Sequence, residues 1–423
     1  MKIILLFCLI VQSIVTFAQP SKQAPAQTKG VFFDTMVIPS LKNSECYITY
    51  QTTCNRLVFV KDKDIFTSHF SLSIEATDSL TGKVYREIDD NEFAVKDFEE
   101  TNSDSKYIQG MVKLTLPYGN YKVVPVIFDY NNSSEHVLPR FDLKVNPPEE
   151  KWALMPIVLK EDPTDGKGAQ SRVFAGFDGN VPFSPETYDM LIPVTDTNIS
   201  SIYVELKNND SLIVKDSIKS SFVASLSFSQ DKESILAGFS HQGKPTRNFI
   251  LPKFNEKLQE GTLKITLTKG KKEKTVFSRS VIWYNKPRSL NNLEYAVKVL
   301  KNMDGENETA KKGKASGSMD YAQLINYWKK FDPTPNTAYN ELMAEFYQRV
   351  DYALNSFSLI SNPDGAETDR GMVYIRFGKP KSVERIYRDS KDVREVWVYE
   401  SPERQFVFVD KSGLGNFILS GKL

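Results

Sequence analysis

The stretch DGAETDRGMVYIRFGKP, Asp364–Pro380, decides how the C-terminal part of this chain folds. Thr368 is a good helix N-cap, and Asp369 falls in the first turn, where the helix dipole favours an anion. Apolar residues follow, Gly378 stands where a left-handed cap is wanted, and a proline two residues later ends the element. Because the start, body and stop signals agree, the stretch predicts a short helix from Asp369 to Phe377.

Two alternatives to this interpretation stay open. Val373, Ile375 and Phe377 alternate along the chain, which is also typical of a strand. Glu367 and Asp369 are a pair of carboxylates that could act as acid and base, as such pairs do in glycoside hydrolysis. We favour the structural role for this segment, because helix capping and the helix dipole already account for its residue types.

Two short helices are predicted upstream, over residues 289–303 and 319–331. Each segment carries apolar residues at helical spacing along one stripe. Ser289 and Ser318 are the expected N-caps, because a serine hydroxyl accepts hydrogen bonds from the free N–H groups of the first turn.

A longer helix is predicted within DPTPNTAYNELMAEFYQRVDYALNSF, Asp332–Phe357. Thr334 can cap it, and Pro335 fits the first turn, where its missing N–H is not needed. Beyond Pro380, the segments VERIYR, EVWVYE, QFVFVD and NFILS predict four short strands. The region 287–423 is therefore expected to be an α+β domain. The residues of the long helix that recur near every 3.6 positions are Leu342, Phe346, Val350, Leu354 and Phe357.

The chain before residue 287 is expected to be almost entirely β. Short alternating segments such as CYITYQT and YKVVPVIFD are separated by turn signals, and no helical period persists. This pattern predicts two antiparallel β-sandwich domains, 31–147 and 148–286, which meet at the proline-rich linker NPPEEK. The corner LTLPYGNYKVVPVIFD, in which Tyr121 opens a strand after a Pro and Gly turn, resembles the late-strand corner of immunoglobulin-like sandwiches.

Residues 1–18 are typical of a secretory signal peptide. Lys2 precedes a short apolar run, and small residues precede an expected cut after Ala18. A membrane anchor is the alternative, but the apolar run is shorter than the ~20 residues that a span needs. Residues 19–30 are expected to form a flexible N-terminus. We therefore expect an exported protein that is periplasmic, outer-membrane-associated or secreted, with no transmembrane span in the mature chain.

Two cysteines remain after that cut, Cys46 and Cys54, within ECYITYQTTC. Export permits a disulfide between them. A continuous strand would hold them more than about 25 Å apart, at a rise of ~3.3 Å per residue, so a bridge requires a hairpin between them. A bridge and two unbridged buried thiols both stay open, and we favour the second.

Composition and charge exclude several classes of function. The 423 residues include 54 basic and 53 acidic side chains, so the basic excess typical of nucleic-acid binding is missing. The three histidines, His69, His136 and His241, all precede the C-terminal part. No Cys and His spacing typical of a metal site occurs, and no nucleophile motif occurs. We therefore expect no nucleic-acid partner, no cofactor, no metal and no catalytic residue, and we favour a protein that is not an enzyme.

The segments FDPTPNTAYNELMAEFYQRVDYALNSF, GAETDRGMVYIRFGKP and EVWVYESPERQFVFVD, in this order, resemble the GWxTD domain of exported proteins found mainly in Bacteroidota. The name-giving motif maps to Gly365–Asp369, with Ala366 where the family has Trp. The resemblance implies structural or partner-binding roles for the motif and no established enzymatic activity. A fainter analogy, at the level of fold alone, links this part to BamE/SmpA-type domains. The motif residues are Asp332, Pro333, Thr334, Pro335, Gly365, Thr368, Asp369, Arg370, Gly371, Gly378 and Pro380.

Three functions fit these observations. The first is a non-enzymatic cell-envelope scaffold that binds protein partners through strand edges and aromatic grooves, in outer-membrane assembly or secretion. The second is a carbohydrate or peptide hydrolase that uses Glu367 and Asp369. The third is a glycan-binding module in which aromatic rings stack on sugars. We favour the scaffold, because it explains the export signal and the missing catalytic set without a further assumption.

Overall fold

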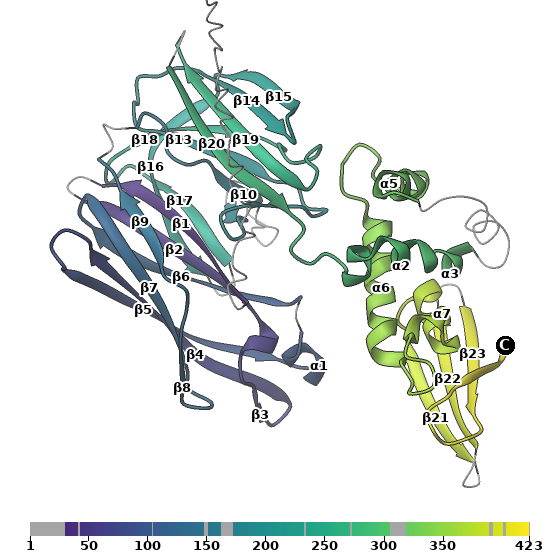
Figure 1. Cartoon of the computed structure of the whole chain (residues 1–423). Helices are drawn as coiled ribbons and strands as arrows, with labels where there is room; N and C mark the ends of the chain where they lie inside the picture. The colour runs from purple at the N-terminus through teal and green to yellow at the C-terminus, as the bar shows by residue number, and fades with distance from the viewer. Residues whose placement is uncertain are drawn as a thin grey trace, which may run out of the picture.

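The computed structural model of the chain shows a mostly β protein whose helices gather near the C-terminal end, apart from one short helical turn (Figure 1). The expected signal peptide and residues 19–29 of the expected flexible segment lie outside the described residues. The structure describes residues 30–40, 43–103, 105–147, 151–161, 172–231, 234–270, 273–304, 319–388, 392–400 and 403–422.

The N-terminal elements are β1 (Val31–Pro39), β2 (Ser44–Thr53), β3 (Val60–Asp62), β4 (Ile65–Asp78), β5 (Val84–Val95), α1 (Phe98–Thr101), β6 (Tyr107–Leu116), β7 (Gly119–Asp129), β8 (Ser134–Val137) and β9 (Phe141–Val145). They form a three-stranded sheet, β1-β2-β6, and a second sheet, β3-β4-β7-β8, to which β5 and β9 are added. Both sheets contribute to one core, which contains Ile48, Val112, Leu72 and Val123. Alternate residues along β7 are buried, so the period-2 pattern of the sequence is the period of burial.

The middle elements are β10 (Ile157–Glu161), β11 (Arg172–Phe174), β12 (Val181–Pro182), β13 (Asp189–Val194), β14 (Ile202–Asn208), β15 (Ser211–Ile218), β16 (Ser221–Asp231), β17 (Ser234–Ser240), β18 (Thr246–Leu251), β19 (Gly261–Lys269) and β20 (Glu273–Ile282). Six of them close on themselves in the order β10-β11-β17-β16-β18-β13, and five form the sheet β12-β20-β19-β14-β15. Met190 and Phe249 from the closed sheet share a core with Val204 and Ile265 from the five-stranded sheet.

A separate buried cluster joins the N-terminal and middle strands. Met36 and Tyr47 lie in it beside Leu159 and Phe228, and the rings of Tyr47 and Phe228 meet edge to face at 5.3 Å between centroids. Because these side chains are withdrawn from water at the contact, the two β regions pack against each other through an apolar interface.

The C-terminal elements are α2 (Leu293–Lys298), α3 (Lys301–Asp304), α5 (Tyr321–Trp328), α6 (Glu341–Phe357), α7 (Asp369–Phe377), β21 (Ser382–Arg388), β22 (Asp392–Glu400), β23 (Glu403–Asp410) and β24 (Ile418–Lys422). The four strands form one antiparallel sheet in sequence order. Helices α6 and α7 pack on one face of it (Figure 1), where Phe357 contacts Trp397 and Phe377 contacts Phe406 at 5.5 and 5.0 Å between ring centroids.

Aromatic residues connect the helical part to the middle strands. Phe183, Trp283 and Tyr339 form a triangle with ring centroids 5.2–5.5 Å apart. Beside it, the Ala338 N–H donates a 2.7 Å hydrogen bond to the Glu256 carbonyl. The segment before α6 is therefore attached to the middle strands by both packing and a backbone hydrogen bond.

Helix α7 spans Asp369–Phe377, as predicted, and the strand alternative is wrong. The long helix is different: it begins at Glu341, and Asn340 caps it by accepting a 2.8 Å hydrogen bond from the Met343 N–H. Thr334 and Pro335 lie in the preceding turn, so the predicted cap is wrong. The later start leaves Leu342 38% exposed, and the buried face is Met343, Ala344, Phe346, Tyr347, Val350, Ala353 and Phe357.

The first short helix is broken into α2 and α3, and its predicted cap is also wrong. Asn292 caps α2 by accepting from the Tyr295 N–H, while the Ser289 hydroxyl donates to the Tyr347 carbonyl. Asp320 caps α5 through a capping box with Gln323. The expected cap Ser318 lies outside the described residues. In each case an amide or carboxylate nearer the helix takes the role that we assigned to a serine.

The two cysteines confirm the preferred alternative. Cys46 lies within β2 and Cys54 follows the end of the same strand, so the extended backbone between them holds their buried side chains apart. No disulfide joins them, and the alternative of a bridge across a hairpin is wrong. Burial raises the pKa of the Cys46 thiol to about 12, so it stays protonated and unreactive.

Candidate functional site

The motif Gly365–Asp369 forms a tight connection between α6 and α7. Residues Gly365–Glu367 make a single 3-10 turn, with Gly365 and Ala366 buried. A Cβ on Gly365 would lie 2.7 Å from the Ser358 nitrogen, and a Cβ on Gly371 would overlap the Gly365 carbonyl. Both glycines are therefore needed because each lies directly against neighbouring backbone atoms, which leave no room for a Cβ. Neither glycine is needed for an unusual φ angle.

Capping groups on both sides fix the path of this turn. The Asp364 carboxylate accepts a 3.2 Å hydrogen bond from the Ala366 N–H. The Thr368 hydroxyl donates to the Gly365 carbonyl at 2.8 Å and accepts from the Gly371 N–H at 3.1 Å, so Thr368 is the N-cap that the sequence predicted. At the other end Gly378 has φ 76°, the left-handed region expected for a glycine after a helix.

The two motif carboxylates each have a structural partner. Asp369 Oδ2 accepts a 2.7 Å hydrogen bond from the Leu419 N–H, which ties the start of α7 to β24. Glu367 Oε1 lies 2.6 Å from the Lys301 ammonium and 3.0 Å from that of Lys298. Hydrogen bonds from Lys301 and then Lys298 lower the pKa of Glu367, so it is ionised at neutral pH and poorly suited to donate a proton.

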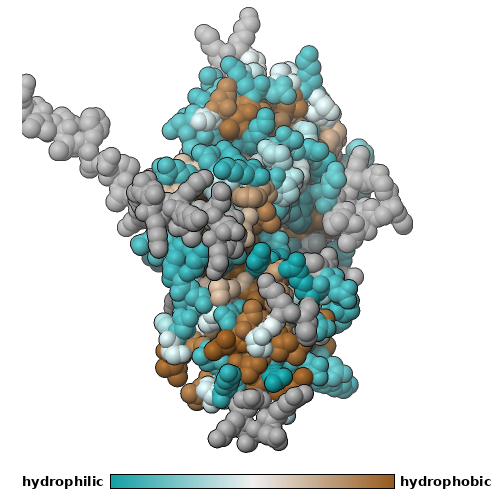
Figure 2. Space-filling model, turned by 90° about the vertical axis from the view of Figure 1, so that its right-hand side faces the viewer, coloured by the Kyte–Doolittle hydropathy of each residue, from teal (hydrophilic) through white to brown (hydrophobic). Residues whose placement is uncertain are grey.

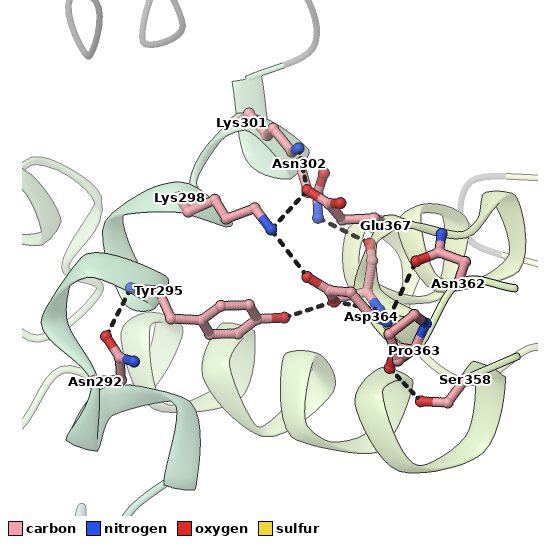
Figure 3. Close-up of polar contacts among 11 residues, drawn as sticks. Asn292, Tyr295, Lys298, Lys301, Asn302, Ser358, Asn362, Pro363, Asp364 and Glu367 are labelled. Atoms are coloured by element: carbon pink, nitrogen blue, oxygen red, sulfur yellow. Dashed lines mark hydrogen bonds and ion pairs between the residues drawn. The ribbon is translucent and has the colours of Figure 1, made fainter. Parts of the chain in front are cut away.

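Asp364 extends this polar cluster, which Figure 3 shows between α2, α3 and the motif turn. Its carboxylate accepts a 2.8 Å hydrogen bond from the Tyr295 hydroxyl and lies 3.1 Å from the Lys298 ammonium. Burial and the hydrogen bond to Asp364 raise the pKa of Tyr295 above its ordinary value. The cluster thus clamps α2 and α3 onto the motif through charges that neutralise one another.

Arg370 lies inside the domain. Its guanidinium stacks 4.4 Å from the centre of the Phe417 ring, donates to the Gly415 carbonyl at 3.3 Å and lies 3.6 Å from Glu395 Oε2. Glu395 is 3% exposed, and it also accepts 2.6 Å and 3.0 Å hydrogen bonds from Trp397 and Arg385. Arg370 therefore pairs with a buried carboxylate and holds the loop before β24.

These observations agree with the comparison to protein families, in which residues 266–417 match the model of the GWxTD domain. The chain contains a GWxTD domain. The matched region starts within β19, so it includes the last two strands of the middle region as well as the helices and the C-terminal sheet. The resemblance seen in the sequence begins later, near Leu290, and rests on segments of both the helices and the C-terminal strands.

Other comparisons add little to this assignment. No curated protein matches the chain. Among solved structures, Escherichia coli alpha-2-macroglobulin activated by porcine elastase is similar at 9% identity and a TM-score of 0.15, over 61% of this chain and 22% of that one. The chain spans about a fifth of that protein, and a likeness this weak carries no argument about fold or function.

The residue at which this GWxTD domain differs from the family motif, Ala366, lies in the interior of the domain. Ala366 is 0% exposed, and its carbonyl accepts a 3.2 Å hydrogen bond from the Asn302 side chain. The side chain at this position is wholly withdrawn from the surface, so it packs in the core and is not a contact for a partner.

The DPTP segment of the GWxTD domain shapes the entry to α6. Asp332 Oδ1 accepts from the Thr334 N–H at 2.8 Å, and the Thr334 hydroxyl donates to Glu341 Oε2 at 2.6 Å. Pro333 and Pro335 flank this turn and restrict its backbone. The segment therefore orients the residues that contact the middle strands, and it lies apart from the motif turn in sequence and in role.

Several residues that complete the GWxTD site were not predicted from the sequence: Tyr295, Lys298, Lys301, Asn302, Glu395 and Asp410. One of them had a usable signal. Glu395 alternates with Trp397 and Tyr399 in EVWVY, so the period of a strand places a charge on the buried face. The others become neighbours only through the fold.

The described ranges hold no group of His, Cys, Asp and Glu side chains that could bind a metal ion. None of the helices in those ranges is long and apolar enough to span a bilayer. The interactions that the site itself shows are capped turns, ion pairs and packed aromatic rings.

Proposed function

We propose that this chain is a non-enzymatic, exported component of the cell envelope that binds another protein through its C-terminal sheet. The observation that carries the proposal is the contrast between the two faces of this sheet. On the face toward α6 and α7, Trp397, Phe406 and Phe408 are buried.

The opposite face carries an apolar strip among the polar side chains of Glu384, Arg394 and Gln405, and no described helix lies on it. We call it the valine face, and its members are Val396, Val398, Val407 and Val409, which are half-buried, and Ile418, which is 55% exposed. Val396 and Val407 stand directly opposite each other on neighbouring strands. Figure 2 shows hydrophobic residues gathered on the lower part of the molecule, at the height of the C-terminal sheet.

Two physical arguments support protein binding here. Contiguous exposed apolar surface is costly in water and is typical of sites where another protein is bound. Strand β21 also lies at an edge of the sheet, where its outer N–H and C=O groups can pair with an added strand. On the side of the valine face, β21 contributes Glu384 opposite Val396 and Ile386 opposite Arg394, whereas the exposed Val383 and Tyr387 lie on the same face as Trp397.

The motif carboxylates support a non-enzymatic role. Glu367 is held by two lysines, and Asp369 accepts the Leu419 N–H, so each has a partner within the domain. A pair of glycosidase carboxylates instead flanks an open substrate site, with one member kept protonated. This is why we rank the hydrolase that uses Glu367 and Asp369 below the scaffold.

The proposal includes export and domain organisation. Residues 1–18 would direct the chain out of the cytoplasm, to the periplasm, the outer membrane or the medium. Domains 31–147 and 148–286 would be β-rich spacers, the first of them immunoglobulin-like, that carry domain 287–423 to its partner in outer-membrane assembly or secretion. A hydrogen bond of 2.8 Å from the Tyr121 hydroxyl to the Pro117 carbonyl supports the first sandwich, because such a tyrosine corner is typical of that fold.

Affinity purification from native outer membranes tests this function. The tagged full chain should recover a defined envelope protein, and Val396→Thr/Val407→Thr should reduce that recovery at least several-fold, because threonine keeps the strand shape but adds a hydroxyl. The matched control is Val276→Thr on β20, where the valine is 50% exposed but lies far from the valine face in sequence and sheet. Equal recovery by both variants would contradict the proposal.

A further inference from the structure

A cavity of about 310 Å³ lies between the N-terminal and middle β regions, far from the valine face. Gln51 of β2 and Tyr107 and Gln109 of β6 line it from one side, and Phe177 and Tyr284 line it from the other. Its volume is at the lower end of the range typical of small-molecule sites, which also occur preferentially between domains. It shares no residue with the GWxTD motif.

One wall of the cavity is a group of stacked aromatic rings. Phe177 and Tyr284 stack at 4.4 Å with an angle of 15° between their planes, and Tyr107 meets both edge-on at 5.3 Å. Phe177 is buried, whereas the two tyrosines are half-buried at the cavity. The wall therefore offers flat apolar rings together with polar tyrosine edges, a surface suited to a ligand that has both an apolar face and polar groups.

The rest of the lining mixes apolar residues, such as Val173 and Phe174, with polar ones, and its charges are balanced. The Gln51 amide nitrogen donates to Gln109 Oε1 and to the Gly176 carbonyl, each at 3.3 Å. Lys160 and Glu186 at the cavity pair with each other at 2.9 Å, so their charges cancel. A site without excess charge favours a neutral ligand over an anion or a cation.

The side-chain oxygen of Gln51 also lacks a hydrogen-bond donor in the described part of the chain. This Oε1 atom is buried. An unsatisfied buried acceptor costs about 1–3 kcal/mol, which a donor from a ligand would recover after a small rotation of the amide. A purely apolar ligand would leave this cost in place, whereas a hydroxyl group would remove it.

We propose that this cavity binds one neutral pyranose sugar, either free or as a unit of a glycan. The ring's C–H face would lie on the Tyr284 side, and its hydroxyl groups would reach Gln51, Gln109 and Glu186. This binding goes beyond the protein contact proposed for the valine face, and it uses other residues.

Glycan-array binding and calorimetric titration of the full chain test the proposal. The probes are methyl glycosides of glucose, galactose, mannose and N-acetylglucosamine, which represent free sugars, and an array of neutral and anionic glycans. Binding to a methyl glycoside identifies a free sugar as the ligand, whereas binding only on the array identifies a unit of a chain. Binding to neither set, or to anionic glycans alone, would overturn the proposal.

Variants assign the binding to the cavity. Gln51→Leu removes the amide and Tyr284→Leu removes the stacking ring, and each should weaken binding at least tenfold. The control is Tyr352→Leu, which removes another stacked tyrosine, 4.3 Å from Tyr374 in the C-terminal domain, and should leave binding unchanged. If Tyr284→Leu fails to fold, Gln51→Leu decides the matter, and binding that survives this substitution unchanged would overturn the assignment.

Discussion

Replacing Arg370 by methionine tests whether this motif residue stabilises the domain or faces a partner. Methionine retains most of the apolar stem, so the substitution removes mainly the charge and its contacts. Those contacts are the approach of 3.6 Å to Glu395, the hydrogen bond to the Gly415 carbonyl and the stacking on Phe417. Each belongs to the interior of the domain.

The size of the effect depends on the hydrogen bonds that Glu395 retains when Arg370 is replaced. Removing one partner of a buried ion pair typically costs ~3–5 kcal/mol, but Arg385 and Trp397 still hold this carboxylate. Losing a cation–π contact of Arg370 adds about 0.5–2 kcal/mol. We therefore expect Arg370→Met to lower the free energy of unfolding of the C-terminal domain by about 2–3 kcal/mol.

Urea unfolding followed by tryptophan fluorescence, together with calorimetry to resolve the C-terminal transition, measures this loss. Glu395→Gln and the double variant complete a cycle, in which we expect a coupling energy of about 1–2 kcal/mol between the two side chains. The control Arg376→Met removes an exposed arginine that lies 5.6 Å from the centre of the Phe377 ring, and it should change stability little. Unchanged stability in Arg370→Met, with loss of the recovered partner, would refute the structural role.

Three further predictions follow from individual contacts. Asp369→Ala should cost about 1–2 kcal/mol, because the Leu419 N–H loses its acceptor and the helix loses an anion at its start; loss of a measured hydrolytic activity at unchanged stability would contradict this. Gly371→Ala should destabilise the domain by about 1–3 kcal/mol or more in urea unfolding, because its Cβ would overlap backbone, whereas Gly421→Ala, which meets nothing within 4 Å, should not. Burial raises the pKa of Asp34 from 3.8 to about 6, so the folded state holds this proton more tightly than the unfolded state, and stability should fall as pH rises from about 4 to about 6. Asp34→Asn should lack that part of the pH dependence, and parallel stability curves for the two proteins would be the contrary result.

The sequence predicted the elements whose signals are local. Helix α7 has its cap, apolar body and glycine stop within eleven residues, so its bounds could be read directly from Thr368–Gly378. The β character of the first two regions was equally accessible, because alternation of apolar residues is the pattern of burial itself.

The start of α6 was not accessible in this way. Both Thr334 and Asn340 are good caps, and the choice between them depends on contacts made across the fold. The Thr334 hydroxyl is taken by Glu341, and the segment between the two caps is held on the middle strands by Tyr339. Tertiary contacts therefore override the local signal.

The candidate site likewise contains residues whose roles follow from the local sequence and residues that only the fold brings together. The capping roles of Thr368 and Gly378 follow from the chain alone, whereas the lysines that neutralise Glu367 come from helices more than sixty residues earlier. The valine face likewise depends on which side of the sheet the helices cover, because strand alternation defines two faces but does not say which one is buried.

Site-specific photo-crosslinking from the valine face tests the central proposal most directly. A photoreactive amino acid placed at Val407 should give one discrete protein adduct when the chain is expressed and irradiated in cells with an intact outer membrane. The same group at Val276, an exposed valine on β20, should give no such adduct. An adduct of equal yield at both positions, or none at Val407, would contradict the account that the C-terminal sheet binds a protein partner.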